Sequence, residues 1–261
     1  MKKPITLALA GTLAAATLLV GYTAQAEPGS DTIAQSRTSQ IDSVSPALAK
    51  YDKERVQELW NDDSLSRRDR GLVTIAVLIS NGQTEELGRY TDRALDDGLS
   101  AAEISETVAH LAFYTGWQNA KAAVPVIAEV FDKHGIDADQ LPERNPDLLP
   151  QDQAAEEARE KSVQEQYGSV SQGVVDDTNE VLFDDLWLRP DLKPRDRSLI
   201  TVVALISTAQ SNQITFHLNK AMDNGLTDDE VDALLNHTAY FVGWPKVFTA
   251  MPVIRDVLEA R

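Results

Sequence analysis

Two histidines on neighbouring predicted helices are the residues best suited to chemistry in this sequence. Of the four histidines, His134 falls in a linker-like segment, His110 aligns with His237 in an internal repeat, and His217 has no histidine partner. Histidine exchanges protons near neutral pH, so a pair on adjacent helices suits general acid and base work. We predict His217 and His237 as catalytic residues. The alternative for each is a hydrogen-bonded place in the core.

Arg197 is the predicted binding group for a substrate carboxylate. It stands in the first turn of a predicted helix, as does its repeat partner Arg70, and the helix dipole disfavours a cation there. A planar guanidinium binds a carboxylate through two parallel hydrogen bonds, which would explain the position. The alternative is an ion pair within the fold, to Asp196 or to an acid across the interface between the repeats.

Aromatic residues near His237 are predicted to complete a binding pocket. Tyr240 and Trp244 follow His237 closely, and Trp244 comes directly after a glycine turn. We expect both to contact the substrate by flanking a small apolar cavity. Trp244 and its repeat partner Trp117 have an alternative role as core residues.

Glu230 is not a good catalytic partner for His237, although seven residues bring it to nearly the same helix face. Seven residues span about 10.5 Å along a helix axis, which is too far for a direct hydrogen bond. The segment 227–230, Thr-Asp-Asp-Glu, and its counterpart 100–103 both have the pattern of a capping box. Capping therefore accounts for Glu230 and Glu103 without a catalytic role.

The sequence lacks the residues or motifs of several common kinds of catalytic and binding site. There is no cysteine, which excludes disulfides, thiolate metal ligands and cysteine-based peroxidase chemistry. The sequence also lacks a His-Glu-x-x-His metal motif, a Gly-x-Ser-x-Gly elbow and a phosphate-binding glycine loop. We accordingly predict no metal and no cofactor.

An internal repeat organises the chain. Arg70 aligns with Arg197, and the same offset of 127 residues runs without a gap from residues 60 and 187 to residues 130 and 257. Each copy has the pattern of helices joined by short turns, with no alternating apolar run that would indicate a strand. We predict an all-α fold of two tandem helical units, at 45–133 and 166–261. A linker with a helical end, 134–165, separates them.

The first residues have the features of an export signal. Lys2 and Lys3 precede an apolar run over 5–20, and Ala24-Gln25-Ala26 is a small-residue cleavage pattern. We predict a signal peptide over 1–26 with cleavage after Ala26, a polar tail over 27–44, and a periplasmic or secreted mature chain. The net charge of -17 argues against nucleic acid as a partner and, once the leader is removed, against a membrane.

Three segments of the second copy, 192–199, 216–227 and 237–245, resemble the carboxymuconolactone decarboxylase family. Segments 66–72 and 110–117 of the first copy repeat the likeness. The resemblance implies the all-helical fold shared with alkylhydroperoxidase-D-like (AhpD-like) proteins, which assemble as trimers or hexamers. A tandem chain is then a fused dimer, and three chains would form a homo-oligomer of six units. The family's peroxide-linked branch depends on cysteines, which this chain lacks.

The resemblance and the residues together predict a cofactor-free carboxy-lyase acting on a small carboxylated lactone or related keto acid. In this hypothesis Arg197 binds a carboxylate, and His217 and His237 stabilise charge on the lactone oxygen and return a proton to carbon. The alternative is an exported, non-catalytic binding or assembly protein of the same fold. The copies differ, because Tyr90 and Gln118 replace His217 and Pro245, so the second copy is the expected location of the site.

Overall fold

The computed structural model describes residues 40–261, which divide into two units at Tyr51 and Asp52. The predicted signal peptide and most of the predicted polar tail lie outside the described residues. In the first unit, residues 40–44 are helical and α2 (Pro46–Tyr51) follows. The last residues of the predicted tail are therefore helical, and the Ser45 amide donates to the Ile41 carbonyl at their end.

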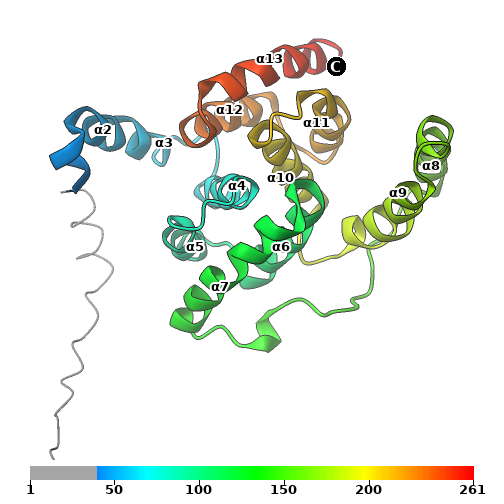
Figure 1. Ribbon diagram of the computed structural model, residues 1–261, viewed down its shortest axis with the longest axis horizontal. Helices are drawn as coiled ribbons and strands as arrows, with labels where there is room; N and C mark the ends of the chain where they lie inside the picture. Colours follow the sequence, from blue (N-terminus) through cyan, green and yellow to red (C-terminus); the bar gives the residue numbers. More distant parts are fainter. Residues whose placement is uncertain (1–39) are drawn as a thin grey trace, which may run out of the picture. The chain divides into compact units, whose positions relative to one another are not determined.

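The second unit, Asp52–Arg261, holds almost all of the described chain and both sets of repeated helices (Figure 1). No strand occurs anywhere in residues 40–261. The elements of the first copy are η1 (Asp52–Val56), α3 (Gln57–Leu59), α4 (Arg67–Ser80), α5 (Leu87–Asp96), α6 (Ala101–Thr115) and α7 (Trp117–His134). Those of the second copy are α9 (Gln172–Asp177), η3 (Thr178–Phe183), η4 (Leu186–Leu188), α10 (Pro194–Ser207), η5 (Ser211–Gln213), α11 (Ile214–Asp223), α12 (Asp228–Val242) and α13 (Trp244–Glu259).

The segment predicted as a linker is partly structured. A short turn, η2 (Ala138–Gln140), follows α7, and α8 (Gln153–Tyr167) forms the predicted helical end. The side chain of Asp152 caps α8 by accepting hydrogen bonds from the amides of Ala154 and Ala155. Among the described helices, none combines the length and the apolar character that a membrane span requires.

Helices α4 and α10 form the centre of the second unit because they are buried on nearly every side. In α4 every residue from Asp69 to Ser80 is buried, and in α10 every residue from Asp196 to Ser207. A helix that is covered all round needs neighbours on all faces. These two helices pack against each other, and between them they also contact α5, α6, α7, α11, α12 and α13.

The residues that predict helix ends in the sequence lie at helix ends in the structure. Capping boxes start α6 at Ser100 and α12 at Thr227, so Glu103 and Glu230 are helix caps, as predicted. Pro194 occupies the first turn of α10, where its missing amide hydrogen costs nothing. Gly243 has a φ of 88°, which only glycine adopts easily, and it separates α12 from α13.

One helix of each copy packs against the central helix of the other copy. Helix α6 lies against α10, and α12 lies against α4 (Figure 1). The two copies are thus interlocked rather than placed side by side. This arrangement decides which side chains share a site, because residues of one copy reach the centre of the other.

A network of ion pairs joins the N-termini of α4 and α10 across this interface. Arg68 donates to Asp196 at 2.7 Å, and its repeat partner Arg195 lies 2.9 Å from Asp69. Each arginine also binds the capping glutamate of its own copy, Arg68 with Glu103 and Arg195 with Glu230. The capping glutamates therefore serve the helix start and the interface at once.

Candidate functional site

His237 belongs to a buried cluster formed with the first copy. Its Nε2 lies 2.8 Å from Thr74 Oγ1, and its Nδ1 lies 3.5 Å from Arg70 Nη1. The Thr74 hydroxyl donates its hydrogen to the Arg70 carbonyl, and a guanidinium only donates. The imidazole consequently donates through Nε2 and accepts at Nδ1.

Both nitrogens of His237 are therefore occupied within the fold. Burial, with Arg70 as a smaller cause, lowers the pKa of His237 to about 3, so the ring is neutral at pH 7. The ring also packs edge-on against Trp60, with centroids 5.3 Å apart. This geometry matches the core role that was the alternative for His237, and it leaves neither nitrogen free for a substrate.

His110 occupies the equivalent place in a second cluster, with the copies exchanged. Its Nε2 lies 2.8 Å from Thr201 Oγ1, and its Nδ1 lies 3.4 Å from Arg197 Nη1. Thr201 donates to the Arg197 carbonyl, which fixes the same tautomer as in His237. Burial lowers the pKa of His110 well below its usual range.

His217 lies in the cluster of His110 and not in that of His237. Its ring stacks on Trp187 at 6.0 Å between centroids and meets Tyr114 edge-on at 5.4 Å. The expectation that His217 and His237 form one site is therefore wrong. The reason is the interlocked packing, because α12 carries His237 towards the first copy while α6 brings His110 to the second.

Arg197 is not available to bind a substrate. Its Nη2 lies 2.6 Å from Oε2 of Glu106 on α6, and both side chains are buried, with exposed fractions of 0% and 3%. Arg189 binds the other oxygen of the same carboxylate at 2.8 Å. The structure thus shows the contact named as the alternative for Arg197, an ion pair to an acid across the interface between the repeats.

Tyr240 and Trp244 pack against each other. Their rings meet edge-on with centroids 4.8 Å apart, Tyr240 is partly exposed, and 48% of the surface of Trp244 is open to solvent. Neither residue lines the cavities beside His217. The predicted small cavity between the two rings is replaced by direct contact between them.

His217 differs from the other buried histidines because one of its nitrogens has no partner. Its Nδ1 is buried and makes no hydrogen bond within the described chain. Burial, with Lys220 as a smaller cause, lowers the pKa of His217 to about 4, so the ring is neutral at pH 7. A neutral ring with a free nitrogen can donate or accept one hydrogen bond to a bound molecule.

Two cavities adjoin this cluster, both covered by α8. The apolar chamber has a volume of about 520 Å³ and is lined by Tyr114, Ala155, Ala158, Arg159, Ser162, Val163, Thr178, Leu182, Phe183, Phe216 and His217. The polar chamber has a volume of about 440 Å³ and is lined by residues 149–152, Ala155, Glu156, Arg159, Phe183, Trp187, Leu188, Pro194, Phe216, Asn219, Lys220, Asp223 and Asn224.

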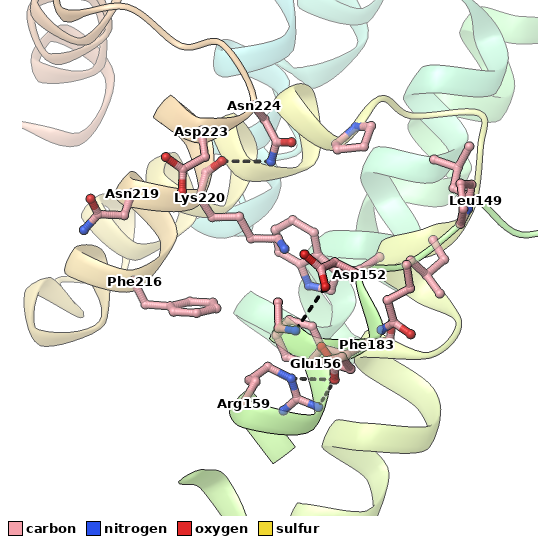
Figure 2. Close-up of a pocket in the computed structure, with 16 residues that line it drawn as sticks. Leu149, Asp152, Glu156, Arg159, Phe183, Phe216, Asn219, Lys220, Asp223 and Asn224 are labelled. Atoms are coloured by element: carbon pink, nitrogen blue, oxygen red, sulfur yellow. Dashed lines mark hydrogen bonds and ion pairs between the residues drawn. The ribbon is translucent and has the colours of Figure 1, made fainter. Parts of the chain in front are cut away.

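The polar chamber brings side chains of α8 and α11 towards one another (Figure 2). Lys220 and Phe216 extend from α11, while Arg159 and Glu156 extend from α8. The Lys220 ammonium lies 5.0 Å from the centre of the Trp187 ring. Burial lowers the pKa of Lys220 from its ordinary value, so this lysine gives up its proton more readily than one in water.

Lys220 and Arg159 are candidate site residues that the sequence analysis missed. Lys220 follows His217 by three residues on one helix, a spacing that puts both on the same face and would have revealed it. Arg159 belongs to the charged helix α8, which lies outside the matched stretches of the repeat, 60–130 and 187–257. No spacing in the sequence connects Arg159 with His217.

In the first copy, an aromatic ring takes the place of His217. Tyr90 stacks on Trp60 with centroids 5.8 Å apart, as His217 stacks on Trp187. Arg93, the counterpart of Lys220, lies 3.6 Å from the centre of the Trp60 ring. The architecture is therefore kept in both copies, while the free imidazole nitrogen is found in the second copy.

Three carboxylates near α8 were considered as a metal site. Oxygens of Glu156, Glu160 and Asp184 lie within 4.8 Å of one another. Glu156 is already bound to Arg159, and Asp184 is exposed. Acidic groups of this kind are common at protein surfaces without an ion, so we assign no metal to them.

Comparison with known proteins connects both copies to one family. The model of the carboxymuconolactone decarboxylase family matches residues 46–129 and again residues 173–256. The two matches begin 127 residues apart, the same offset as the internal repeat, and together they cover more than half of the chain. They leave out the whole of α8.

Two curated relatives are decarboxylases. The 4-carboxymuconolactone decarboxylase of Acinetobacter baylyi is 35% identical over 79 residues, which are 30% of this chain and 59% of that protein. The nitrosuccinic acid decarboxylase of Metarhizium robertsii is 36% identical over 58 residues, 22% of this chain and 41% of that protein. The matched region thus spans less than two thirds of either relative.

A solved structure described as a gamma-carboxymuconolactone decarboxylase subunit, from Burkholderia xenovorans, aligns with 90% of this chain and 92% of that chain. The TM-score is 0.45 and the sequence identity 18%. The predicted all-α fold of two tandem AhpD-like units is confirmed by the helices of the described residues and by the double family match. Because that match covers both copies, the chain belongs to the carboxymuconolactone decarboxylase family.

Proposed function

We propose that this protein is a cofactor-free carboxy-lyase that removes carbon dioxide from a small carboxylated lactone or a related keto acid. The reaction takes place in the cavities beside His217. One observation carries the proposal: His217, whose buried Nδ1 has no partner in the described chain, lines a cavity together with Arg159, while Lys220 lines the adjoining chamber. The decarboxylase relatives support the reaction class.

Decarboxylation requires a group that stabilises the electron pair left when carbon dioxide departs. It also requires an acid that protonates the carbon. When the bond to the carboxyl carbon breaks, carbon dioxide leaves and the electron pair moves towards the lactone or keto oxygen. The neutral His217 ring donates an N–H to that oxygen. The Lys220 ammonium then protonates the carbon and regains a proton from solvent.

This assignment changes the roles expected from the sequence. Arg197 is paired with Glu106 and His237 with Thr74, so neither acts on the substrate in the proposed reaction. The cations of the site are instead Lys220 and Arg159. His217 keeps the role of hydrogen-bond donor to the substrate oxygen.

The test is release of carbon dioxide from a panel of carboxylated lactones and keto acids, with product mass as a second readout. We expect the variants His217→Asn and Lys220→Met to lose about 100-fold or more in kcat/KM, as is typical for removing a general acid. Arg93→Met, the same change at the matching position of the first copy, serves as the control and retains activity. Full activity in both site variants would overturn the proposal.

A non-catalytic binding or assembly protein is the second candidate. The full hydrogen bonding of His110 and His237 favours it, because these residues hold the fold together. A purified protein that binds carboxylates but releases no carbon dioxide from any member of the panel would support this candidate. Release of carbon dioxide therefore distinguishes the carboxy-lyase from the binding protein.

We also propose that the mature chain is exported. The support is the sequence of residues 1–26, with its two lysines, apolar run and Ala24-Gln25-Ala26 ending. N-terminal sequencing of protein from a periplasmic or culture fraction is expected to begin at Glu27. Retention of the leader in the cytoplasmic fraction would count against export.

Finally, we propose a homo-oligomer of three tandem chains. The two copies expose aromatic side chains at equivalent positions, Trp117 with an exposed fraction of 51% and Trp244 with 48%. Phe248 and Met251 extend the exposed apolar surface on α13. Native mass measurement should give three chains, and Trp117→Glu with Trp244→Glu should give single chains. A wild-type mass of one chain would contradict the proposal.

A further inference from the structure

Helix α8 is a wall of the candidate site, although all of it lies outside the family matches. The matches end at residue 129 and resume at residue 173, and α8 spans Gln153–Tyr167 between them. Ala155 and Arg159 of α8 line both chambers. This helix therefore adds contacts to the site that the repeated units do not themselves provide.

Arg159 is held rigidly within this wall. Its Nε donates to Glu156 Oε1 at 2.6 Å, and its Nη2 donates to Asn179 Oδ1 at 2.9 Å as well as to Glu156. The guanidinium lies 4.0 Å from the centre of the Phe183 ring. These contacts fix the plane of the guanidinium before any ligand arrives, which lowers the entropy cost of binding.

One nitrogen of this guanidinium has no partner. The Nη1 atom of Arg159 is buried and makes no hydrogen bond within the described chain, and the side chain as a whole has an exposed fraction of 11%. A buried, unsatisfied N–H group of a charged side chain costs free energy that a ligand oxygen can recover. The same holds for the free Nδ1 of His217 in the same wall.

The residues that line the apolar chamber around Arg159 indicate which class of ligand it would bind. Among the residues that line the apolar chamber, Arg159 carries the only charge at pH 7, because His217 is neutral. Most of the other walls are hydrocarbon, including Val163, Leu182 and Phe216. A hydrocarbon group with one carboxylate matches such a chamber, whereas a neutral polar group leaves the guanidinium nitrogen without a strong acceptor.

We infer that Arg159 of α8 binds the carboxylate that the reaction leaves in place, and that the apolar chamber holds the hydrocarbon arm bearing this carboxylate. This inference rests on the proposed function for the identity of the reacting end. Phe183 and Phe216 line both chambers, so a single molecule can extend from Arg159 towards Lys220. Helix α8 is accordingly the specificity element that this chain adds to the repeated fold.

The experiment measures binding rather than turnover. The probes are 3-phenylpropanoate and its neutral amide, 3-phenylpropanamide, titrated into the full-length mature protein by calorimetry. We expect the wild type to bind the carboxylate about tenfold or more tightly than the amide, the worth of one charge-assisted hydrogen bond. Arg159→Gln should abolish this preference. Lys161→Met, which removes an exposed charge from the same helix, should keep it.

A second variant distinguishes a loss of carboxylate binding from a loss of folding. Arg159→Lys keeps the charge but lacks the planar fork, so its preference for the carboxylate should fall several-fold without disappearing. Equal binding of acid and amide by the wild type, or an unchanged preference in Arg159→Gln, would overturn the inference. A protein that discriminates between the probes but releases no carbon dioxide would instead refute the proposed function, while Arg159 would remain the carboxylate-binding residue of the apolar chamber.

Discussion

The Nη2 atom of Arg197 lies 2.6 Å from Oε2 of Glu106, in an ion pair that joins the second copy to the first and is closed to solvent. The first copy has no equivalent pair, because Ala233 stands at the repeat position of Glu106. There, Arg70 is bound instead by Asp62, at the repeat position of Arg189. Arg197 is thus paired with an acid of the other copy, and Arg70 with an acid of its own copy.

Removing the carboxylate of Glu106 should destabilise the fold strongly. Glu106→Ala leaves the buried Arg197 without its partner, and an uncompensated buried charge costs about 3–5 kcal/mol. Urea unfolding of the variant should show this loss in the free energy of unfolding. Glu129→Ala, at an exposed position of α7, is the control and should change little. A loss below about 1 kcal/mol in Glu106→Ala would contradict the buried ion pair.

Coupling between Arg68 and Asp196 should be measurable across the repeat interface. A double-mutant cycle with alanine at both positions is expected to give a coupling energy of about 1–3 kcal/mol, because both side chains are partly or fully buried. The control is Arg255 with Asp256, whose side chains are 63% and 68% exposed. That cycle should give a coupling near zero. Equal coupling in the two cycles would refute the interface network.

Acid should destabilise the protein through its buried histidines. The pKa of His237 is lowered to about 3 in the folded chain, against about 6.5 when unfolded. The unfolded chain therefore binds more protons between these values, so the free energy of unfolding falls as pH drops from about 6.5 towards 3. The contribution is fully present above pH 6.5.

The variant His237→Gln tests this origin of the acid sensitivity, since glutamine retains a hydrogen-bond donor but does not titrate. Its unfolding free energy should depend less steeply on pH between about 6.5 and 3 than that of the wild type. Asn236→Gln, at the exposed neighbouring position, should keep the wild-type slope. Identical slopes in all three proteins would contradict the assignment.

Helices α4 and α5 approach too closely for a side chain at Gly71. A Cβ atom at this position would lie 2.9 Å from the Cβ of Ala94. Alanine normally favours a helix over glycine by about 1 kcal/mol, but overpacking costs about 1–3 kcal/mol. We expect Gly71→Ala to lower the melting temperature, while Ser198→Ala at the matching position of the second copy has little effect. A raised melting temperature for Gly71→Ala would show that the helices can separate.

The elements of the fold follow from local signals in the sequence. The offset of 127 residues, the capping boxes at Ser100 and Thr227, and Pro194 each report a preference of the nearby backbone, so they predict helices and their ends. Local signals do not say which helix of one copy lies against which helix of the other. That choice depends on packing between segments far apart in the chain.

The site was predicted less well for the same reason. His217 was identified because it breaks the repeat, but pairing it with His237 assumed that each copy builds its own site. No feature of the sequence identified Glu106 as the partner of Arg197, because this acid comes from the other copy. Arg159 lies in a helix outside the matched stretches of the repeat, and only the folded chain brings it to the cavity of His217.

The interlocked packing of α6 on α10 and of α12 on α4 has a consequence for how the copies can change. Each copy supplies the histidine that fills the centre of the other, so neither can be deleted without opening a hole in its neighbour. A unit that fills the centre of its neighbour is needed for packing whether or not it has a site of its own. The first copy can therefore carry Tyr90 in place of His217 and still be indispensable to the second.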